Sequence, residues 1–442
     1  MPTPLTSNVV IIGAGLAGLT LALALHQKGI PSTIYELRPA SATTPGALML
    51  SPNALRILDN LGLYENLKPQ GFNFETVTFK DETERTTDTY FLGSARVYGY
   101  DCLRIYRAVL LADLRAAAQA AGIQIHYETK FSRIVADDPA AGATLEFASG
   151  ARVTASLLLA ADGIHSRVRA HVAPSVQPRY AGLVAITYAL PRAAVSFAPT
   201  PDNEDQYPCP VAIAAAPGTF VLAPQNRNGS ELLAGTQRRY PEQDRAGWDA
   251  LSANPAKLKA LLRGKDEGAN WPPTVRSALE TIPEHSLSIW PYYAIPPLER
   301  WTSNTARVVL LGDAAHAIPP TAGQGASQAL EDAWSFAHLL ATHHASASTS
   351  TTTSSFNSSD SPLAHWRTTT HHWQRYRQQR VARVTALTLL LNNTRLPAAE
   401  RARLAPGQAW QSSGEGEPAW LYCADVVGEM EMEGVLGERG VV

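Results

Sequence analysis

The first part of the chain alternates short, wholly apolar runs with longer runs of helical periodicity. Residues 8–15 (NVVIIGAG) predict a buried strand that breaks into a glycine turn, and residues 16–29 (LAGLTLALALHQKG) predict a helix that ends at Gly29. Residues 32–38 (STIYELR) are typical of a second strand. A strand, a helix and a strand in such close succession form a βαβ unit, whose two strands must be parallel.

Further elements follow the same pattern up to residue 162. We expect a helix over residues 51–63 with Ser51 as its N-cap, and an amphipathic helix over residues 103–121. Three strand-like runs come next and are expected to return the chain to the first sheet: residues 123–129, 143–149 and 155–162.

The pattern changes near residue 180 to short alternating segments separated by proline, glycine and asparagine. Such spacing predicts a largely antiparallel sheet, built from residues 183–190, 210–216, 219–225 and 231–240. Residues 307–313 (RVVLLGD) then restore the buried-strand pattern of the first part. The second sheet is therefore expected to be a domain inserted into the first.

The fold class that follows is α/β: a Rossmann-like domain with an inserted, largely antiparallel β-sheet substrate domain and a C-terminal helical segment. Residues 346–361 hold 12 Ser or Thr in 16 positions, which predicts a disordered loop because so little apolar surface can be buried there. A regulatory phosphorylation segment is the alternative. The expected division is 1–174 and 301–340 for the first domain, 175–300 for the sheet domain, 341–363 for the loop and 364–442 for the helical region.

Composition narrows the class of partner. Lys and Arg number 37 against 39 Asp and Glu, a formal charge of −2, which argues against nucleic acid or an anionic membrane surface as main partner. The three cysteines match no metal or redox spacing, so we expect no metal site. No apolar run is long enough for a membrane span and no secretory pattern is present, so we expect a cytoplasmic protein. We expect it to be a monomer or a homodimer.

A glycine fingerprint marks the first strand end. Gly13, Gly15 and Gly18 form G-x-G-x-x-G between a strand and a helix, and Glu36 ends the next strand. The glycines permit a tight turn and close approach of a pyrophosphate at the helix N-terminus, and the carboxylate is placed to accept hydrogen bonds from a ribose. A purely structural turn would not explain Glu36. We therefore predict a dinucleotide site.

Two more apolar strands end in a carboxylate. Asp162 is followed by Gly163, and Asp313 by a loop rich in proline and glycine. Taken alone, Asp162-Gly163 has an ordinary interpretation as a turn, with Arg167 and Arg169 as solvated surface charges. Together with the glycine fingerprint, however, the strand ends indicate one ligand.

Over residues 8–395 the sequence resembles the single-component flavin-dependent aromatic hydroxylases, such as salicylate- and para-hydroxybenzoate-hydroxylase-like monooxygenases. It is also similar to tetracycline-inactivating monooxygenases and to fungal biosynthetic hydroxylases. The motifs that carry the resemblance are GAGLAG (13–18), RIYRAVL (104–110), ADGIHSRVR (161–169) and GDAAHAIPPTAGQGASQALEDA (312–333). The last is long and highly specific.

The resemblance implies non-covalently bound FAD, with Asp313 accepting from its ribityl chain and the helix that starts near residues 324–327 directing free N–H groups at the flavin ring. His316 is expected to have a structural role, and no catalytic residue is identified. The implied cofactor-binding residues are Gly13, Gly15, Gly18, Glu36, Gly46, Ala47, Arg107, Asp162, Asp313, Gly323, Gly325 and Ala326.

The implied activity is that of an FAD-dependent monooxygenase which uses NADPH or NADH and O2. It would hydroxylate or epoxidise an aromatic or polycyclic small molecule through a flavin hydroperoxide, in secondary-metabolite biosynthesis. Candidate substrate-pocket residues are Thr187, Tyr188 and Pro319, although Thr187 and Tyr188 also have an interpretation as ordinary strand residues. A flavin halogenase or reductase on the same scaffold, or a flavin-binding protein without turnover, are the alternatives.

Overall fold

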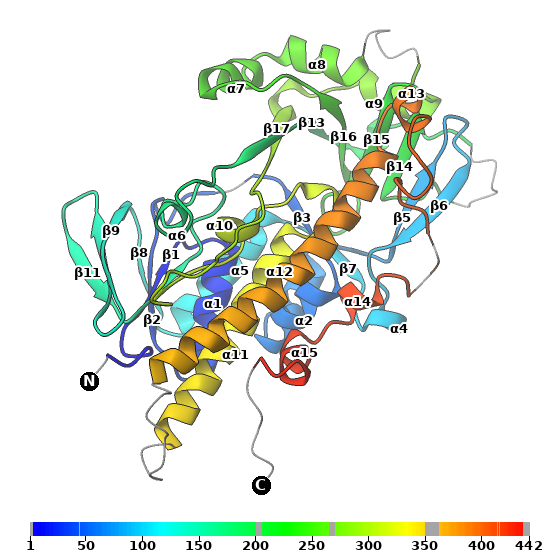
Figure 1. Cartoon of the computed structure of the whole chain (residues 1–442). Coiled ribbons are helices and arrows are strands. Elements are labelled where there is room, and N and C mark those ends of the chain that lie inside the picture. The colour runs from blue at the N-terminus through cyan, green and yellow to red at the C-terminus, as the bar shows by residue number, and fades with distance from the viewer. Residues whose placement is uncertain are drawn as a thin grey trace.

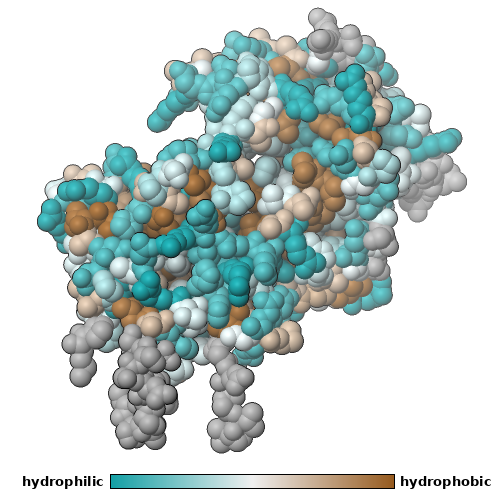
Figure 2. Space-filling view, in the orientation of Figure 1, coloured by the Kyte–Doolittle hydropathy of each residue, from teal (hydrophilic) through white to brown (hydrophobic). Residues whose placement is uncertain are grey.

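The computed structural model describes residues 3–43, 45–199, 206–264, 270–349, 362–412, 414 and 416–435. Figure 1 shows two sheet-containing parts, with the long helix α12 running diagonally across both. In Figure 2 the visible surface is largely polar, and apolar patches can be seen where the two parts meet. No helix within the described ranges is both long and apolar enough to cross a membrane.

A five-stranded parallel sheet forms the centre of the first part, in the order β18-β12-β1-β2-β8. Its strands are β1 (Val9–Ile12), β2 (Ser32–Tyr35), β8 (Gln124–His126), β12 (Leu157–Ala160) and β18 (Val308–Leu310). The central strands are apolar throughout because other elements of the same core cover both faces of this sheet. The predicted α/β class with a βαβ unit is confirmed.

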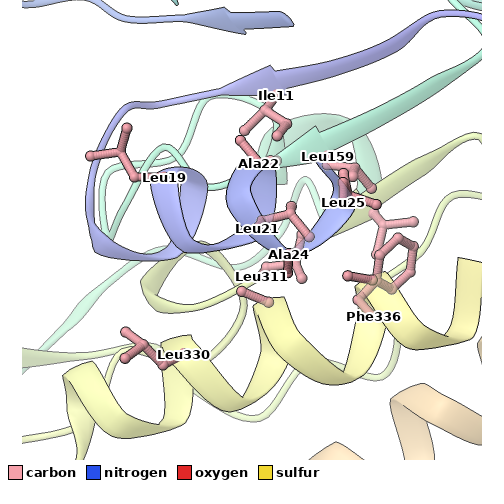
Figure 3. Close-up of a cluster of buried hydrophobic side chains, with 14 of the residues drawn as sticks. Ile11, Leu19, Leu21, Ala22, Ala24, Leu25, Leu159, Leu311, Leu330 and Phe336 are labelled. Atoms are coloured by element: carbon pink, nitrogen blue, oxygen red, sulfur yellow. The ribbon is translucent and has the colours of Figure 1, made fainter. Parts of the chain in front are cut away.

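Helices α1 (Leu16–Gln27), α5 (Arg107–Ala120) and α11 (Gly325–Thr349) belong to this part. Figure 3 shows how β1, β12, α1 and α11 share one core: Ile11, Leu159, Leu21, Leu25 and Phe336 are all buried together. Burying each such side chain contributes roughly 1.5–3 kcal/mol. This core fixes the ends of β1, β12 and β18 relative to the first turns of α1 and α11.

Two predictions in this part were wrong. Cys102–Tyr106 is not helical but forms strand β7, which pairs with β3 (Ala47–Leu50) on one side and with β4 (Phe72–Phe74) on the other, so α5 starts only at Arg107. Pairing on both edges outweighs the local helical pattern. The strand expected over 143–149 does not join the parallel sheet. It is β10 (Gly142–Phe147), between β9 (Phe131–Asp138) and β11 (Arg152–Ala155).

The second part is built on a seven-stranded sheet in the order β17-β13-β16-β15-β14-β5-β6. All neighbouring pairs are antiparallel except β14 with β5. The strands are β5 (Thr76–Lys80), β6 (Thr86–Phe91), β13 (Arg179–Pro191), β14 (Val211–Ala215), β15 (Gly218–Pro224), β16 (Glu231–Arg239) and β17 (Ser288–Ala294). Strands β5 and β6 come from the stretch that the sequence assigned to the first domain.

The two faces of this sheet have different neighbours. Helices α7 (Arg245–Ser252), α8 (Pro255–Arg263) and α9 (Pro273–Glu280) cover one face, which we call the outer face, with a core of its own that includes Ile186, Phe220 and Trp271. Side chains of the opposite, inner face contact the first part. Gln225 Oε1, for example, accepts a hydrogen bond from Arg104 Nη2 of β7 at 3.3 Å.

The C-terminal region is helical, as predicted. Its helices are α12 (Pro362–Thr394), which is the longest described element, α13 (Ala398–Arg401), α14 (Ala419–Tyr422) and α15 (Val426–Met432). The remaining short helices lie earlier in the chain: α2 (Pro52–Asn60), α3 (Tyr64–Leu67), α4 (Ala95–Tyr98), α6 (Arg169–Val172) and α10 (Asp313–His316). The expected loop over 341–363 is corrected at both ends, because α11 continues to Thr349 and α12 begins at Pro362. Residues 350–361 lie outside the described residues.

Candidate functional site

The three glycines of the fingerprint have three separate roles. A Cβ on Gly13, whose φ is +104°, would clash with the backbone of Ala161, and a Cβ on Gly18 would clash with Gly13 O. A Cβ on Gly15 would meet no atom within 4 Å. Gly13 and Gly18 therefore let the turn and α1 pack closely, whereas Gly15 leaves open surface at the N-terminus of α1, where a pyrophosphate is favoured.

Glu36 lies directly beside this turn. Its Oε2 accepts a hydrogen bond from Ala14 N at 2.6 Å, and its Oε1 accepts one from Arg38 N at 2.8 Å. The carboxylate thus stabilises the glycine turn and keeps further lone pairs at the end of β2. Ribose binding by Glu36 stays a prediction.

The Asp162-Gly163 segment is joined to the Gly312-Asp313 segment by a buried arginine. Arg169 Nη1 donates to Ala314 O at 3.1 Å, and its Nη2 donates to Ile164 O at 2.7 Å. The interpretation of Arg169 as a solvated surface charge was therefore wrong, because it is only 2% exposed. Arg167 is exposed, as that interpretation expected.

Asp162 has one carboxylate oxygen without a partner. Oδ2 accepts from Arg167 N at 2.9 Å and from Val168 N at 3.3 Å, but Oδ1 is buried and no hydrogen bond reaches it within the described chain. Burial raises the pKa of this carboxyl, and the hydrogen bonds that it accepts oppose the rise. An unpaired acceptor at a strand end can accept hydrogen bonds from a polar ligand.

Asp313 and Arg107 come from two different elements and lie close enough to interact electrostatically. Asp313 begins α10 and has solvent-accessible surface, yet protein surrounds it closely enough that burial raises the pKa of its carboxyl, against the charges of His316 and Arg107. Arg107 begins α5, and its buried Nε has no hydrogen-bond partner in the described residues. The acceptor and the donor are therefore both available at this place.

The segment that contains Gly46 and Ala47 lies next to Arg107. Arg107 N donates to Gly46 O at 2.9 Å, and Ala47 pairs with Tyr106 across β3 and β7. Gly46 has φ +88°, and a Cβ there would meet no atom within 4 Å, so the backbone is open to close approach.

The loop after Asp313 runs back to the same region. Gly323 has φ +66°, a left-handed conformation that favours glycine, and it lies against the flexible end of Met49 of β3. Pro319 precedes the short 3-10 turn Pro320–Ala322 and is half-buried. Helix α11 begins at Gly325, followed by Ala326, so its first N–H groups lie at the end of this loop, as predicted.

A buried polar cluster supports the start of α11, and no motif in the sequence predicts it. Ser51 Oγ donates to Asn53 Oδ1 at 2.7 Å and accepts from Gln324 Nε2 at 2.8 Å, and it lies 3.2 Å from Ser327 Oγ. Ser51 is the N-cap residue of α2, as predicted, but its hydroxyl makes no capping hydrogen bond to the backbone of α2 and bonds these side chains instead.

His316 is buried and is paired with Asp332. His316 Nε2 lies 2.6 Å from Asp332 Oδ2, and the same oxygen accepts a hydrogen bond from Gly312 N at 2.8 Å. Asp332 Oδ1 accepts from Arg377 Nε at 2.8 Å. Asp332 thus fixes the backbone immediately before Asp313, and the expected structural role of His316 agrees with this geometry.

Glu331 extends this network in the core between α11 and α12. It accepts from Arg377, from Arg380 and, at 2.6 Å, from Asn53 Nδ2, and its side chain is fully buried. Arg380 also donates to Leu421 O at 2.9 Å, which ties α14 to the same group. Burial acts to raise the pKa of Glu331, but Arg380 and Arg377 hold it down at about 2.

We expect a Glu331→Gln variant to be less stable than wild type at neutral pH. Its free energy of unfolding should also depend less on pH in the acid range. Because the folded-state pKa of about 2 lies below the ordinary value of 4.5, the ionised group stabilises the fold above pH 4.5. That contribution is lost as the pH falls through about 2. Urea unfolding at neutral pH and at about pH 3 measures the difference. The exposed Glu280→Gln is the matched control, and an unchanged pH dependence in Glu331→Gln would contradict the assignment.

The two candidates on β13 point to opposite faces of the sheet. Thr187 pairs with Gly235 of β16 and is half-buried on the inner face. Tyr188 is on the outer face, 1% exposed, and its hydroxyl donates to Ala278 O at 2.6 Å. Burial raises the pKa of Tyr188. We therefore withdraw Tyr188 as a substrate-pocket residue, because its hydroxyl belongs to the outer core, and Thr187 stays a candidate.

A Tyr188→Phe variant should be less stable by about 1–2 kcal/mol, because Ala278 O loses its buried donor. Turnover should stay at the wild-type level, since the ring is retained and faces α9. Denaturant unfolding and a steady-state assay measure both effects. Thr187→Val is the comparison on the inner face, where we expect altered turnover and little change in stability. If Tyr188→Phe loses turnover while its stability is that of wild type, Tyr188 is a substrate-pocket residue after all.

The sequence-predicted groups thus gather where β1, β2, β12 and β18 end. The glycine turn, Glu36, Asp162 and Asp313 follow the carboxyl ends of parallel strands, and Arg107 joins them from α5. Ligands of such sheets bind at this edge. The open surface at Gly15 and the unpartnered atoms Asp162 Oδ1 and Arg107 Nε fit a long nucleotide with a charged middle. The arrangement defines a dinucleotide-binding α/β protein.

Comparison with known proteins gives the family. The chain matches the family described as FAD binding domain over residues 6–241 and 277–370. It is 30% identical over 329 residues to 6-hydroxynicotinate 3-monooxygenase of Bordetella bronchiseptica, covering 74% of this chain and 80% of that protein. It is also 30% identical over 328 residues to 3-amino-4-hydroxybenzoate 2-monooxygenase of Streptomyces cremeus, covering 74% and 76%. The chain belongs to the FAD-binding domain family.

The fold agrees with solved structures. The crystal structure of FqzB aligns with a TM-score of 0.73 at 21% identity, covering 99% of this chain and 95% of that one. The predicted resemblance and the predicted FAD cofactor are confirmed, and the protein is an FAD-dependent oxidoreductase. The residues that touch FAD stay predictions.

Proposed function

We propose that the protein is an FAD-dependent monooxygenase that uses NAD(P)H and O2 to hydroxylate or epoxidise an aromatic or heteroaromatic small molecule. The observation that carries the proposal is the convergence of the glycine turn, Asp162, Arg107 and Asp313 at one edge of the parallel sheet, beneath the inner face of the second sheet. The two monooxygenase relatives act, by their names, on hydroxylated ring compounds. A cytoplasmic location and a monomeric or homodimeric state belong to the same proposal.

The protein's part in this reaction is to bind FAD and the substrate and to exclude water from the reacting atoms. Asp313 and Arg107 would hold the polar chain of FAD, and Glu36 with the α1 N-terminus would hold its ADP half. Bound FAD supplies the redox chemistry, taking a hydride from NAD(P)H and transferring one atom of O2 to the substrate while the other leaves as water.

The inner face of the second sheet would position the substrate ring. In the middle of this face Gly235 lies between Thr187 and Val221, and all three are small or apolar. A flat, apolar surface excludes water from the reacting atoms, and its few polar groups set the orientation of the ring. No side chain has to act as a strong base for an atom of O2 to be transferred, which agrees with the structural role of His316.

Purified protein tests the proposal directly. We expect a yellow protein with stoichiometric FAD, NAD(P)H oxidation coupled to O2 uptake, and a product that carries isotopic label from oxygen gas. A flavoprotein without coupled oxygen uptake would be a binder or a reductase, and a halide-dependent product would be that of a halogenase. Either result would overturn the proposal.

A further inference from the structure

One end of the inner face carries a buried amide without partners. Gln237 follows Gly235 by two residues on β16, lies opposite Ala185 of β13 and therefore belongs to the same face as Thr187. Its Nε2 and Oε1 are both buried, and no hydrogen bond reaches either atom within the described residues. An unsatisfied buried polar group costs about 1–3 kcal/mol. This amide is therefore placed to bind a polar group that the chain itself does not supply.

An arginine without a counter-ion lies at the same end. Arg395 follows the last residue of α12, its Nε is buried without a partner, and its guanidinium forms no ion pair or hydrogen bond with the described part of the chain. Burial lowers its pKa, and only the nearby Tyr292 hydroxyl acts in the opposite direction. The residue as a whole is half-buried, and an arginine that is partly removed from water is normally paired with a carboxylate.

The strand order places both groups at the same end of the second sheet. Arg395 O lies 3.6 Å from the position of a Cβ on Gly218 of β15, while its charge interacts with Tyr292 of β17. In the order β17-β13-β16-β15, the strand that carries Gln237 lies between those two. Tyr292 is on the inner face, because Ser288 of the same strand pairs with Thr187, so the Arg395 side chain extends toward that face. Figure 1 shows the C-terminal end of α12 reaching this sheet.

The same end contacts the loop that follows Asp313. Thr321 of that loop interacts with the Tyr292 hydroxyl and is hydrogen-bonded to Asn392 of α12. The polar groups of Arg395 and Gln237 thus lie between the inner face and the segment that would lie along the flavin. A ring on the apolar middle of the face would reach them with a substituent.

We propose that Arg395 and Gln237 bind a carboxylate on the aromatic or heteroaromatic ring of the substrate. The guanidinium would donate to both carboxylate oxygens, and Gln237 Nε2 would donate to one of them. Gln237 Oε1 would accept from an adjacent N–H or O–H on the ring. The inference rests on the proposed function and adds to it the chemical class of substrate.

The test compares ring acids with their neutral amides. FAD-loaded protein is titrated with 2-hydroxybenzoate and 2-hydroxybenzamide, and with indole-2-carboxylate and its amide, and binding is followed by the flavin absorbance. We expect the acid of at least one pair to bind about 10-fold or more tightly than its amide. Arg395→Met should weaken binding of the acid by about 10- to 100-fold and leave that of the amide unchanged. Gln237→Leu should weaken it severalfold.

Two further variants make the result decisive. Arg395→Lys keeps the positive charge but loses the planar guanidinium, so it should retain part of the preference for the acid over the amide. If Arg395→Met does not fold, Arg395→Lys takes its place in the test. Arg403→Met removes an exposed cation from the same segment and should change nothing. An unaltered preference in the Arg395 variants, or no preference for any acid in wild-type protein, would overturn the inference. Wild-type protein that lacks FAD or NAD(P)H oxidation would instead refute the proposed function, before any titration.

Discussion

An Asp313→Ala variant is expected to purify with substoichiometric FAD while it keeps the wild-type fold. Asp313 accepts no hydrogen bond from the described residues, and it interacts electrostatically with Arg107, whose Nε has no partner among those residues. Removing the carboxylate deletes a charged acceptor for the cofactor's polar chain without breaking a contact of the protein. Hydrogen bonds to charged groups contribute about 1.5–3 kcal/mol, which corresponds to FAD affinity weakened by about 10- to 100-fold.

The measurement is flavin absorbance per protein after gel filtration, together with FAD titration of the stripped protein. Circular dichroism and thermal unfolding of the FAD-free proteins check the fold. Asp249→Ala on α7 is the control, because this carboxylate is 77% exposed and distant from the strand ends. Stoichiometric FAD in Asp313→Ala would count heavily against the proposed site.

An Arg377→Met variant is expected to be destabilised by about 3–5 kcal/mol, the usual effect of removing one partner from a buried ion network. Arg377 is fully buried and donates to Glu331, to Asp332 and to Gln328. Without it the two carboxylates share Arg380 and His316 as their remaining charged neighbours. Because Asp332 also holds Gly312 N, we expect FAD affinity to fall as well.

Chemical denaturation measures the loss, and Arg375→Met provides the comparison, because Arg375 is exposed on the same helix. The control should differ from wild type by less than about 0.5 kcal/mol. If both variants have wild-type stability, the network has no net stabilising effect. If Arg377→Met is destabilised but binds FAD normally, the link through Asp332 to the Gly312 backbone is refuted.

The sequence predicts the residues of the site that belong to short, contiguous motifs. An apolar run followed by glycine or aspartate marks each strand end. Gly13, Asp162 and Asp313 could therefore be found without knowing the fold. Sheet topology then brings them together, because parallel strands of one sheet end at one edge. The sequence did not reveal the support of the site. Glu331 and Arg377 are 46 residues apart, and each alone looks like a charge on a solvated helix face.

The substrate side was harder to predict for a geometric reason. Alternation along β13 shows that Thr187 and Tyr188 face opposite ways, but not which of them faces α9. Only the partners across the sheet decide this, and they come from β16 and from the helix that contains Ala278. Arg395 could not be predicted as a site residue either, since no motif near residue 395 indicates that α12 ends against β15.

The pairing of β5 with β14 limits how the protein can be divided. A fragment cut at 175–300, or a graft of that stretch onto a related scaffold, would leave behind Thr76–Lys80 and Thr86–Phe91. Strand β14 would then present Val211–Ala215 as an uncovered edge, and uncovered apolar edges recruit strands from other molecules. Chimeras designed to exchange substrate preference within this family should therefore carry both stretches of chain, or aggregation rather than altered chemistry will be observed.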